Sequence, residues 1–142
     1  MRPYYATEAD WPDIEALLRA SCLSSEGRHD HITQYMIARD NSGLLGCAGI
    51  ERYETTVVLR ALAVAQRARS AGLGELLVSA IVADVRQQGI ETIVLQTATA
   101  SGYFARLGFA PIGISELPSS IHPSHEFDRS SNEMDTLMQT TL

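Results

Sequence analysis

The chain has 142 residues, of which 45% are hydrophobic and 20% are charged, and it carries a net charge of −6 at pH 7. This length and composition are typical of one folded domain, so we expect residues 1–142 to form a single domain with its own hydrophobic core. The acidic balance argues against nucleic acid as a partner, because nucleic acid requires a basic face on the protein. It argues against anionic membrane surfaces for the same reason.

The cysteines and the absence of long apolar segments together point to the cytoplasm. Cys22 and Cys47 form no CxxC pair, so the sequence predicts neither a disulfide framework nor a zinc knuckle. No apolar run reaches the length of about 20 residues that is needed to cross a bilayer. Residues 1–5 lack the apolar segment of a signal peptide, and we therefore expect a cytoplasmic protein.

Hydrophobic periodicity in the first half of the chain predicts one helix followed by an antiparallel meander. Thr7 or Asp10 is suited to cap a helix whose apolar stripe runs to about Ala20. A strong turn signal, Asp40–Gly43, then separates two segments of strand type. The strands expected in this half are residues 1–6, 34–39, 44–51 and 55–64.

The second half of the chain predicts a strand–helix–strand order. An apolar stripe with the period of a helix begins at Gly72 and Gly74, and Gly89 is suited to the left-handed position that ends this helix. Residues 115–132 are rich in serine and are expected to be irregular. The other expected elements are a strand at 92–96, a helix at 100–107 and strands at 109–114 and 133–139. The whole order is α+β in the first half and βαβ in the second.

The start of the long helix has the features of a pyrophosphate site. The first-turn amides of a helix have no partners inside the helix, and the helix dipole favours an anion there. Gly72 and Gly74 lack a Cβ, so a phosphate could approach the backbone closely, with close packing as the alternative reason for these glycines. Arg67 and Arg69 add positive charge beside them. A third glycine and a GK[ST] string are missing, which argues against a dinucleotide fingerprint and a P-loop.

Two motifs stand out in this half of the chain, Arg69-x-x-Gly72-x-Gly74 and Tyr-Phe-Ala-Arg-Leu-Gly-Phe at residues 103–109. Together they resemble the GNAT superfamily of acetyl-CoA-dependent N-acetyltransferases, whose signatures are Arg/Gln-x-x-Gly-x-Gly/Ala and aromatic-x-Lys/Arg-x-Gly-Phe. The resemblance covers nearly the whole chain and implies an α/β fold in which helices flank a mixed, mostly antiparallel sheet. It also implies acetyl-CoA as co-substrate, no metal, and central strands that splay apart after Val64.

The resemblance also implies which residues contact the cofactor. Residues 62–64 match the strand whose backbone pairs with the pantetheine arm, and residues 69–74 match the loop that holds the pyrophosphate. Thr97 or Thr99 matches a position that is often near the pantetheine. The expected cofactor-binding residues are therefore Leu62, Ala63, Val64, Arg69, Ser70, Ala71, Gly72, Leu73, Gly74, Thr97 and Phe104. Backbone N–H groups near residues 62–64 are expected to hold the charge on the thioester oxygen.

The catalytic groups depart from the family pattern. Phe104 stands where many GNAT enzymes have a tyrosine that protonates the departing thiolate. Tyr103 is the candidate acid, although one helical position turns its side chain by about 100°; the thiolate could instead leave unassisted or take a proton from water. The strand before the loop has no glutamate, so Glu51, at the end of the preceding strand, is the candidate base that activates a water. Glu54 is a weaker candidate.

Weak base machinery favours an amine that is already partly neutral. At pH 7 roughly a tenth of an α-amino group with a pKa near 8 is neutral, against about one lysine amine in 2,500. Glu51 and residues 59–64, 103–109, 117–121 and 126–127 also resemble GNAT proteins associated with arsenic resistance and short amino-acid N-acetyltransferases related to N-acetylglutamate synthase. This closer resemblance implies transfer to a small amino acid or an amino-acid-like toxin.

Arg60 and His29 are the candidate substrate-binding residues. The planar guanidinium of Arg60 suits a bidentate grip on a carboxylate, with a pairing to a neighbouring strand residue as the alternative. His29 could line the cleft from an early loop, or belong to a polar surface loop. His122 and His125 have no clear third ligand, so we expect no metal site.

Other functions remain open at this point. The acceptor could be a protein N-terminus, a polyamine or an aminoglycoside, although the acidic residues that a polycation site needs are dispersed in this sequence. A CoA-binding sensor without turnover would explain the missing tyrosine and glutamate. The sequence leaves the oligomeric state open between a monomer and a homodimer.

Overall fold

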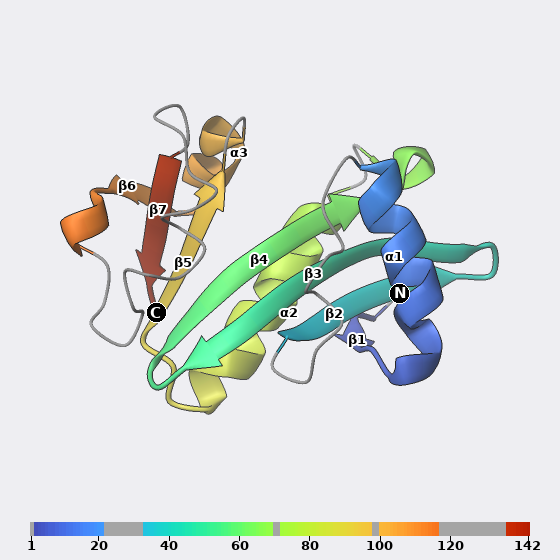
Figure 1. The fold of residues 1–142 in the computed structure, drawn as a ribbon, viewed down its shortest axis with the longest axis horizontal. Coiled ribbons are helices and arrows are strands. Elements are labelled where there is room, and N and C mark those ends of the chain that lie inside the picture. The colour runs from blue at the N-terminus through green and yellow to red at the C-terminus, as the bar shows by residue number, and fades with distance from the viewer. Residues whose placement is uncertain (1, 22–32, 70–71, 98–99, 117–135) are drawn as a thin grey trace.

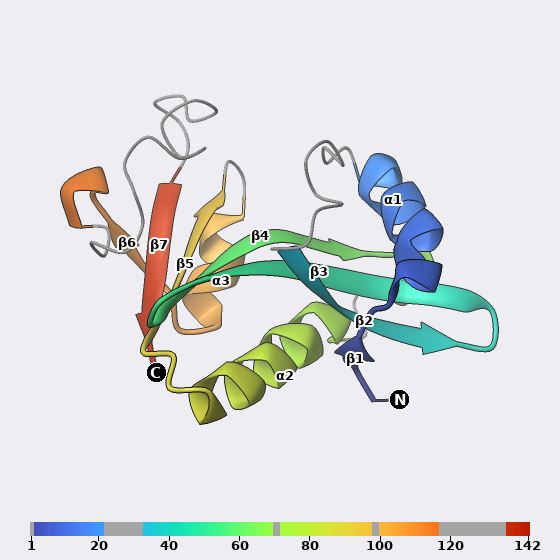
Figure 2. The same cartoon turned by 60° about the horizontal axis from the view of Figure 1, so that its bottom comes forward.

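The computed structural model consists of a seven-stranded sheet with helices on both of its faces (Figures 1 and 2). It describes residues 2–21, 33–69, 72–97, 100–116 and 136–142. The strands are β1 (Tyr4–Tyr5), β2 (Thr33–Asp40), β3 (Gly43–Tyr53), β4 (Thr56–Val64), β5 (Thr92–Thr97), β6 (Ala110–Ile112) and β7 (Thr136–Thr141). The helices are α1 (Trp11–Ala20), α2 (Leu73–Gln87) and α3 (Ser101–Arg106). In space the strands follow the order β1-β2-β3-β4-β5-β7-β6.

Antiparallel pairing dominates this sheet, as predicted. Strands β2, β3 and β4 are neighbours in both chain and sheet, so the expected meander is confirmed. The turn between β2 and β3 forms as its residues suggest, because the Asp40 carboxylate accepts a hydrogen bond from the Ser42 N–H at 2.8 Å and Gly43 has a φ of 128°. The parallel pair is β4 and β5, between which the chain returns through α2.

Several strand boundaries differ from the predicted ones, because strand pairing and not local pattern decides where a strand ends. β6 stops at Ile112, before a 3₁₀ turn at Ile114–Glu116. β7 continues to Thr141, which pairs with the start of β5. β3 continues to Tyr53, so Glu51 lies inside the strand and not at its end.

Strands β4 and β5 are paired along only part of their length. Their register runs from Thr56 opposite Thr92 to Leu59 opposite Leu95. Beyond this point β4 continues to Val64 beside β3, while β5 continues beside β7, and Figure 1 shows the two strands diverging. The predicted splay is therefore present, but it begins after Leu59 and not after Val64.

A β-bulge at Arg60 accounts for this early divergence. Ile50 of β3 pairs with Leu59, and the neighbouring Gly49 pairs with Ala61, so Arg60 is an extra residue in β4. A bulge bends its strand and increases the local twist. The bend falls where the pairing with β5 ends, and it opens the sheet at that point.

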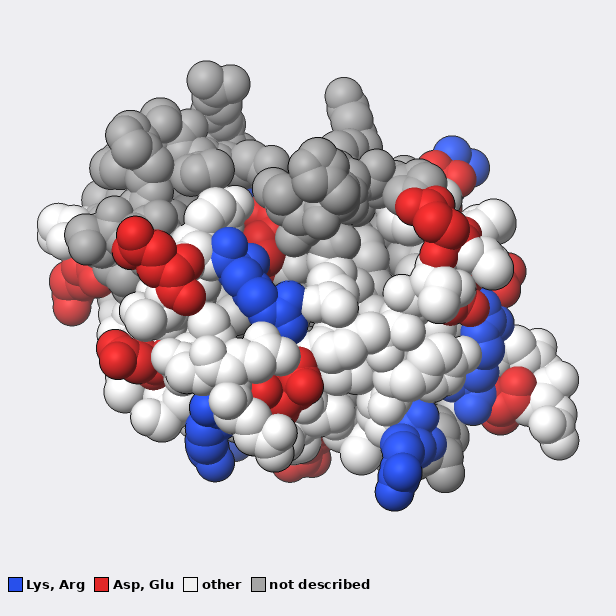
Figure 3. Space-filling view, turned by 90° about the horizontal axis from the view of Figure 1, so that it is seen from below, with Lys and Arg blue, Asp and Glu red and all other residues white. Residues whose placement is uncertain are grey.

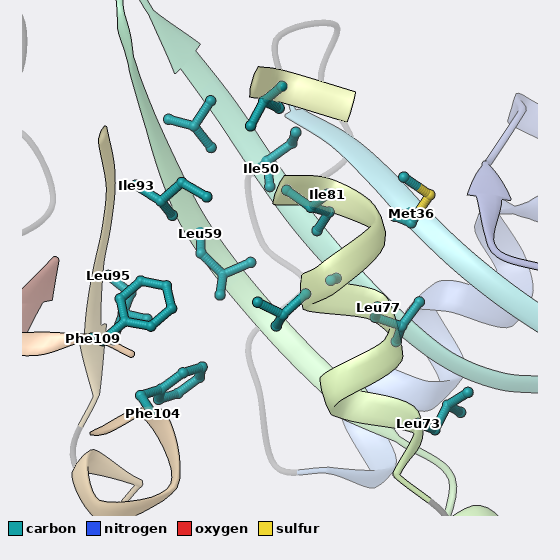
Figure 4. Close-up of a cluster of buried hydrophobic side chains, with 14 of the residues drawn as sticks. Met36, Ile50, Leu59, Leu73, Leu77, Ile81, Ile93, Leu95, Phe104 and Phe109 are labelled. Atoms are coloured by element: carbon teal, nitrogen blue, oxygen red, sulfur yellow. The ribbon is translucent and has the colours of Figure 1, made fainter. Parts of the chain in front are cut away.

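Hydrophobic clusters on the two faces of the sheet hold the helices in place. On one face Leu77 and Ile81 of α2 pack onto the central strands, in the larger cluster shown in Figure 4. On the other face Ile14 and Leu18 of α1 form a smaller cluster, and Figure 2 shows the two helices on opposite sides. Phe104 of α3 joins the larger cluster, which anchors α3 near the separated ends of β4 and β5.

The surface charge is mixed (Figure 3), and the described helices are short or amphipathic. On the face shown in Figure 3, acidic and basic side chains are interspersed, and neither charge is gathered into one patch. Among the described helices, none has the length and hydropathy that are needed to span a membrane.

Candidate functional site

Two cavities adjoin where β4 and β5 diverge. The helix-side cavity, of about 470 Å³, is lined by the end of β4, the start of α2 and part of α3. The strand-side cavity, of about 520 Å³, is lined mainly by the separated parts of β4 and β5. The residues that line both cavities are Leu62, Val64, Arg69, Ala100 and Phe104. Because they share these walls, the two cavities form one groove across the opening in the sheet.

Most residues that the sequence nominated for cofactor binding line this groove. The helix-side cavity contains Leu62, Val64, Arg69, Gly72, Leu73, Gly74 and Phe104. The strand-side cavity adds Ala63, Thr97 and the candidate substrate residue Arg60. Ser70, Ala71 and His29 lie outside the described residues.

Gly72 and Arg69 shape the entrance to the helix-side cavity. Gly72 caps the start of α2 with a φ of 77°, a left-handed conformation that glycine adopts without strain. Among the described residues other than its chain neighbours, no heavy atom lies within 4 Å of the position where its Cβ would be, which leaves room beside the first-turn amides for a phosphate. The Arg69 Nε donates a hydrogen bond to the Val64 carbonyl at 3.2 Å, and this contact holds the guanidinium at the shared wall of the groove.

Arg67 does not contribute to the groove, contrary to the expectation that it adds charge beside the glycines. Its Nη1 and Nη2 donate hydrogen bonds at 2.8 and 3.0 Å to the two carboxylate oxygens of Asp40, in the turn between β2 and β3. These bonds lower the pKa of Asp40 to about 2, with help from the Ser42 N–H. Arg67 therefore fastens the short 3₁₀ turn after β4 to the neighbouring hairpin.

Tyr103 and Phe104 face different parts of the groove. Phe104 is buried between Tyr103 and Phe109, at ring-centroid distances of 5.3 and 5.7 Å, and it lines both cavities. Tyr103 lines only the helix-side cavity, where its hydroxyl lies against Gly74. Desolvation raises the pKa of Tyr103, as does the nearby carboxylate of Glu75, so the hydroxyl stays protonated at neutral pH.

Glu51 and Arg60 form an ion pair beside the strand-side cavity. The Glu51 Oε2 lies 3.6 Å from the Arg60 Nε, and each side chain is 9% exposed. The other carboxylate oxygen, Oε1, accepts a hydrogen bond from the Tyr53 hydroxyl at 2.7 Å. Tyr53 carries no signal of this role in the sequence, because only the extension of β3 to this residue places it, by strand alternation, on the same face as Glu51.

The other candidate groups lie apart from the groove. Glu54 is exposed in the turn between β3 and β4, with a φ of 56°, and lines neither cavity. His122 and His125 are outside the described residues. Within the parts of the chain that are described, no group of three or more His, Cys, Asp or Glu residues is placed to hold a metal ion.

Comparison with known proteins agrees with this geometry. Residues 31–111 match the family model described as an acetyltransferase (GNAT) domain. An uncharacterized N-acetyltransferase of Chlorobaculum tepidum is 30% identical over 99 residues, which are 69% of this chain and 63% of that protein. The amino-acid acetyltransferase of Neisseria meningitidis (strain Z2491) is 28% identical over 124 residues, which are 81% of this chain and 28% of that protein.

The fold has a close match among solved structures. N-acetylglutamate synthase of Neisseria gonorrhoeae, in complex with coenzyme A and N-acetyl-glutamate, superposes with a TM-score of 0.83 and 22% sequence identity. The match covers 100% of this chain and 35% of that one, so this chain corresponds to only part of the larger relatives. The family match, the open sheet and the glycine-led start of α2 agree with one another, and the chain belongs to the GNAT acetyltransferase family.

Proposed function

We propose that the chain transfers an acetyl group from acetyl-CoA to the α-amino group of a small amino acid or an amino-acid-like toxin. The observation that carries this proposal is the groove itself, in which two cavities adjoin at Leu62 and Val64. One cavity ends at the start of α2, and the other has Arg60 in its wall. A donor and an acceptor could therefore meet at the shared wall in one ternary complex, which supplies proximity and orientation.

The helix-side cavity suits the donor. Coenzyme A carries a diphosphate, and the left-handed Gly72, the first-turn amides of α2 and the Arg69 guanidinium offer backbone N–H groups and positive charge for it. Beyond Leu59 the edge of β4 that faces β5 has no strand partner among the described residues. This edge can take the amide groups of a pantetheine arm in the manner of an added strand.

The strand-side cavity suits an acceptor with a negative charge. The described residues that line it include Arg60 and Arg69 and no carboxylate. An aminoglycoside or a polyamine would bring several positive charges into this cavity without an acidic partner. An amino acid brings one carboxylate, for which the guanidinium fork of Arg60 is well suited.

The reaction would proceed by direct attack of the neutral amine on the thioester carbonyl. Backbone N–H groups near Leu62 and Val64 would hold the oxyanion as the new C–N bond forms and the C–S bond breaks. Phe104 has no proton to donate, and the Tyr103 hydroxyl is turned towards Gly74. The departing thiolate would therefore take its proton from water, and the amine would lose its proton to water.

Acetyl transfer to a panel of free L-amino acids tests this proposal. The release of the CoA thiol should depend on the amino acid, and mass spectrometry should find the N-acetyl product. Spermidine and kanamycin serve as polycationic comparisons and should react at least tenfold more slowly. Tight binding of CoA in calorimetry without thiol release from any amine would instead favour the non-catalytic sensor, which the phenylalanine at position 104 makes the second candidate.

A further inference from the structure

Tyr53, Glu51 and Arg60 form a chain of contacts that leads to the groove. The Tyr53 hydroxyl donates to one carboxylate oxygen of Glu51 at 2.7 Å, and the other oxygen lies 3.6 Å from the Arg60 Nε. Glu51 as a whole is only 7% exposed. A carboxylate and a guanidinium at this depth neutralise each other, because either charge alone would be costly to bury.

The bulge in β4 determines where Arg60 lies. Leu59 packs into the cluster on the α2 face, and Ala61 packs into the cluster on the α1 face. Arg60, the extra residue between them, stands where β4 leaves β5, and it lines the strand-side cavity. Glu51 lines neither cavity. Of the two charged residues, it is therefore Arg60 that lies at the wall of the groove.

We propose that Glu51 and Tyr53 are positioning residues that orient Arg60 to bind the carboxylate of the acceptor. This inference rests on the proposed function and gives its substrate class a structural basis: acceptors with a free α-carboxylate. Glu51 then acts through Arg60 and does not take the proton of the amine. The five N–H donors of a guanidinium form a planar fork, which suits this group to bind a carboxylate in a bidentate manner.

Tyr53 has a distinct part in this arrangement. Its ring packs beside the small cluster of Val58 and Val94, which fixes the position of its hydroxyl. The hydroxyl then restrains Glu51, two residues earlier on the same face of β3. Removal of the hydroxyl should loosen Glu51 and Arg60 without leaving a charge unpaired, and this makes Tyr53→Phe the gentlest test of the chain of contacts.

The experiment compares acceptors that differ only in the carboxylate. L-alanine, L-methionine and L-glutamate are each measured against their α-carboxamides, in the wild type and in the variants Tyr53→Phe, Glu51→Gln and Arg60→Met. The readout is the ratio of kcat/KM for the acid to kcat/KM for the amide. Tyr4→Phe, an exposed tyrosine on β1 at the far edge of the sheet, is the matched control.

The wild type should prefer the acids, and Arg60→Met should abolish that preference. Loss of the hydrogen bond from its hydroxyl to the Glu51 carboxylate predicts that the preference falls about fivefold in Tyr53→Phe. Loss of the carboxylate charge beside Arg60 predicts that it falls about tenfold or more in Glu51→Gln. In each variant this lower preference should come from a higher KM for the acid, and kcat/KM should fall more for the acid than for the amide. Circular dichroism and CoA binding show whether each variant is folded.

Other outcomes contradict the inference in recognisable ways. If Glu51→Gln lowered kcat for acid and amide equally and removed the acidic limb of the pH–rate profile, Glu51 would be the base. If the wild type had the same kcat/KM for acid and amide, Arg60 would not bind the carboxylate of the acceptor. If no acceptor turned over, the proposed function would fail, and calorimetry of L-glutamate in the presence of CoA would decide the inference: binding weakened by Tyr53→Phe supports it, and no binding overturns it.

Discussion

The hydroxyl of Tyr103 occupies the space beside Gly74 that a Cβ at position 74 would need. Gly72, two residues earlier in the same motif, has a φ of 77°, and none of the described residues beyond its chain neighbours lies within 4 Å of its Cβ position. The two glycines are therefore required for different reasons. Gly72 provides a left-handed backbone at the start of α2, and Gly74 allows α3 to approach that helix closely.

The first prediction concerns this contact. Gly74→Ala should lower the free energy of unfolding by about 1–2 kcal/mol, because the half-exposed ring of Tyr103 must turn aside. In a Tyr103→Leu background the same change should cost little, since the obstructing hydroxyl is gone. Urea denaturation of the four proteins gives the coupling between the two positions. Equal costs of Gly74→Ala in both backgrounds would show that the contact has no energetic role.

The second prediction separates the two arginines of the loop. Arg69→Gln should weaken the binding of CoA about tenfold, which is the usual effect of losing one charge-assisted contact, and should reduce its dependence on salt. Arg67→Gln is the matched control, because Arg67 is bound to Asp40 and lines neither cavity. Calorimetry at two salt concentrations measures both effects. A similar loss in both variants would mean that only net charge matters.

The third prediction is a pH dependence of stability. Burial raises the pKa of the Cys47 thiol from 9.0 to about 12. Between these values the unfolded chain loses the thiol proton and the folded chain keeps it, so stability falls as the pH rises, by up to about 1.4 kcal/mol per pH unit. Below a pH of about 9 both states are protonated and the effect vanishes.

Cys47→Ala should remove this part of the alkaline destabilisation. Burial and the Asp84 carboxylate raise the pKa of Tyr5 to about 12. Tyr5 therefore also lowers stability at alkaline pH, but it is present in both proteins. The difference in unfolding free energy between wild type and variant should therefore narrow or change sign above a pH of about 9. Urea denaturation over this range measures it, and a difference that stayed constant with pH would contradict the prediction.

The fourth prediction concerns the core beneath the groove. Leu77 is fully buried against the sheet, whereas its neighbour Leu76 is 39% exposed. Leu77→Ala should cost about 2–5 kcal/mol, because it leaves a cavity at the centre of the larger cluster. Leu76→Ala should cost less than about 1 kcal/mol, since surface positions contribute little. Comparable losses in the two variants would mean that α2 does not pack as described.

Some functional features needed no tertiary information. The order of helices and strands followed from hydrophobic periodicity, and the loop proposed to hold a pyrophosphate was nominated from Arg69, Gly72 and Gly74. These features depend on interactions within a few residues, namely backbone preferences, turn chemistry and the free amides at a helix start. A local pattern in the sequence is enough to reveal such interactions.

The contacts between distant segments were decided only by the tertiary structure. The bulge at Arg60 leaves no mark in the sequence of β4, yet it sets where the sheet opens and which residues face the groove. Register, in turn, brings Glu51 to Arg60 and takes Arg67 away to Asp40. Because a side chain's partners depend on how strands slide and bend against each other, the amino-acid order alone could nominate these residues but could not pair them.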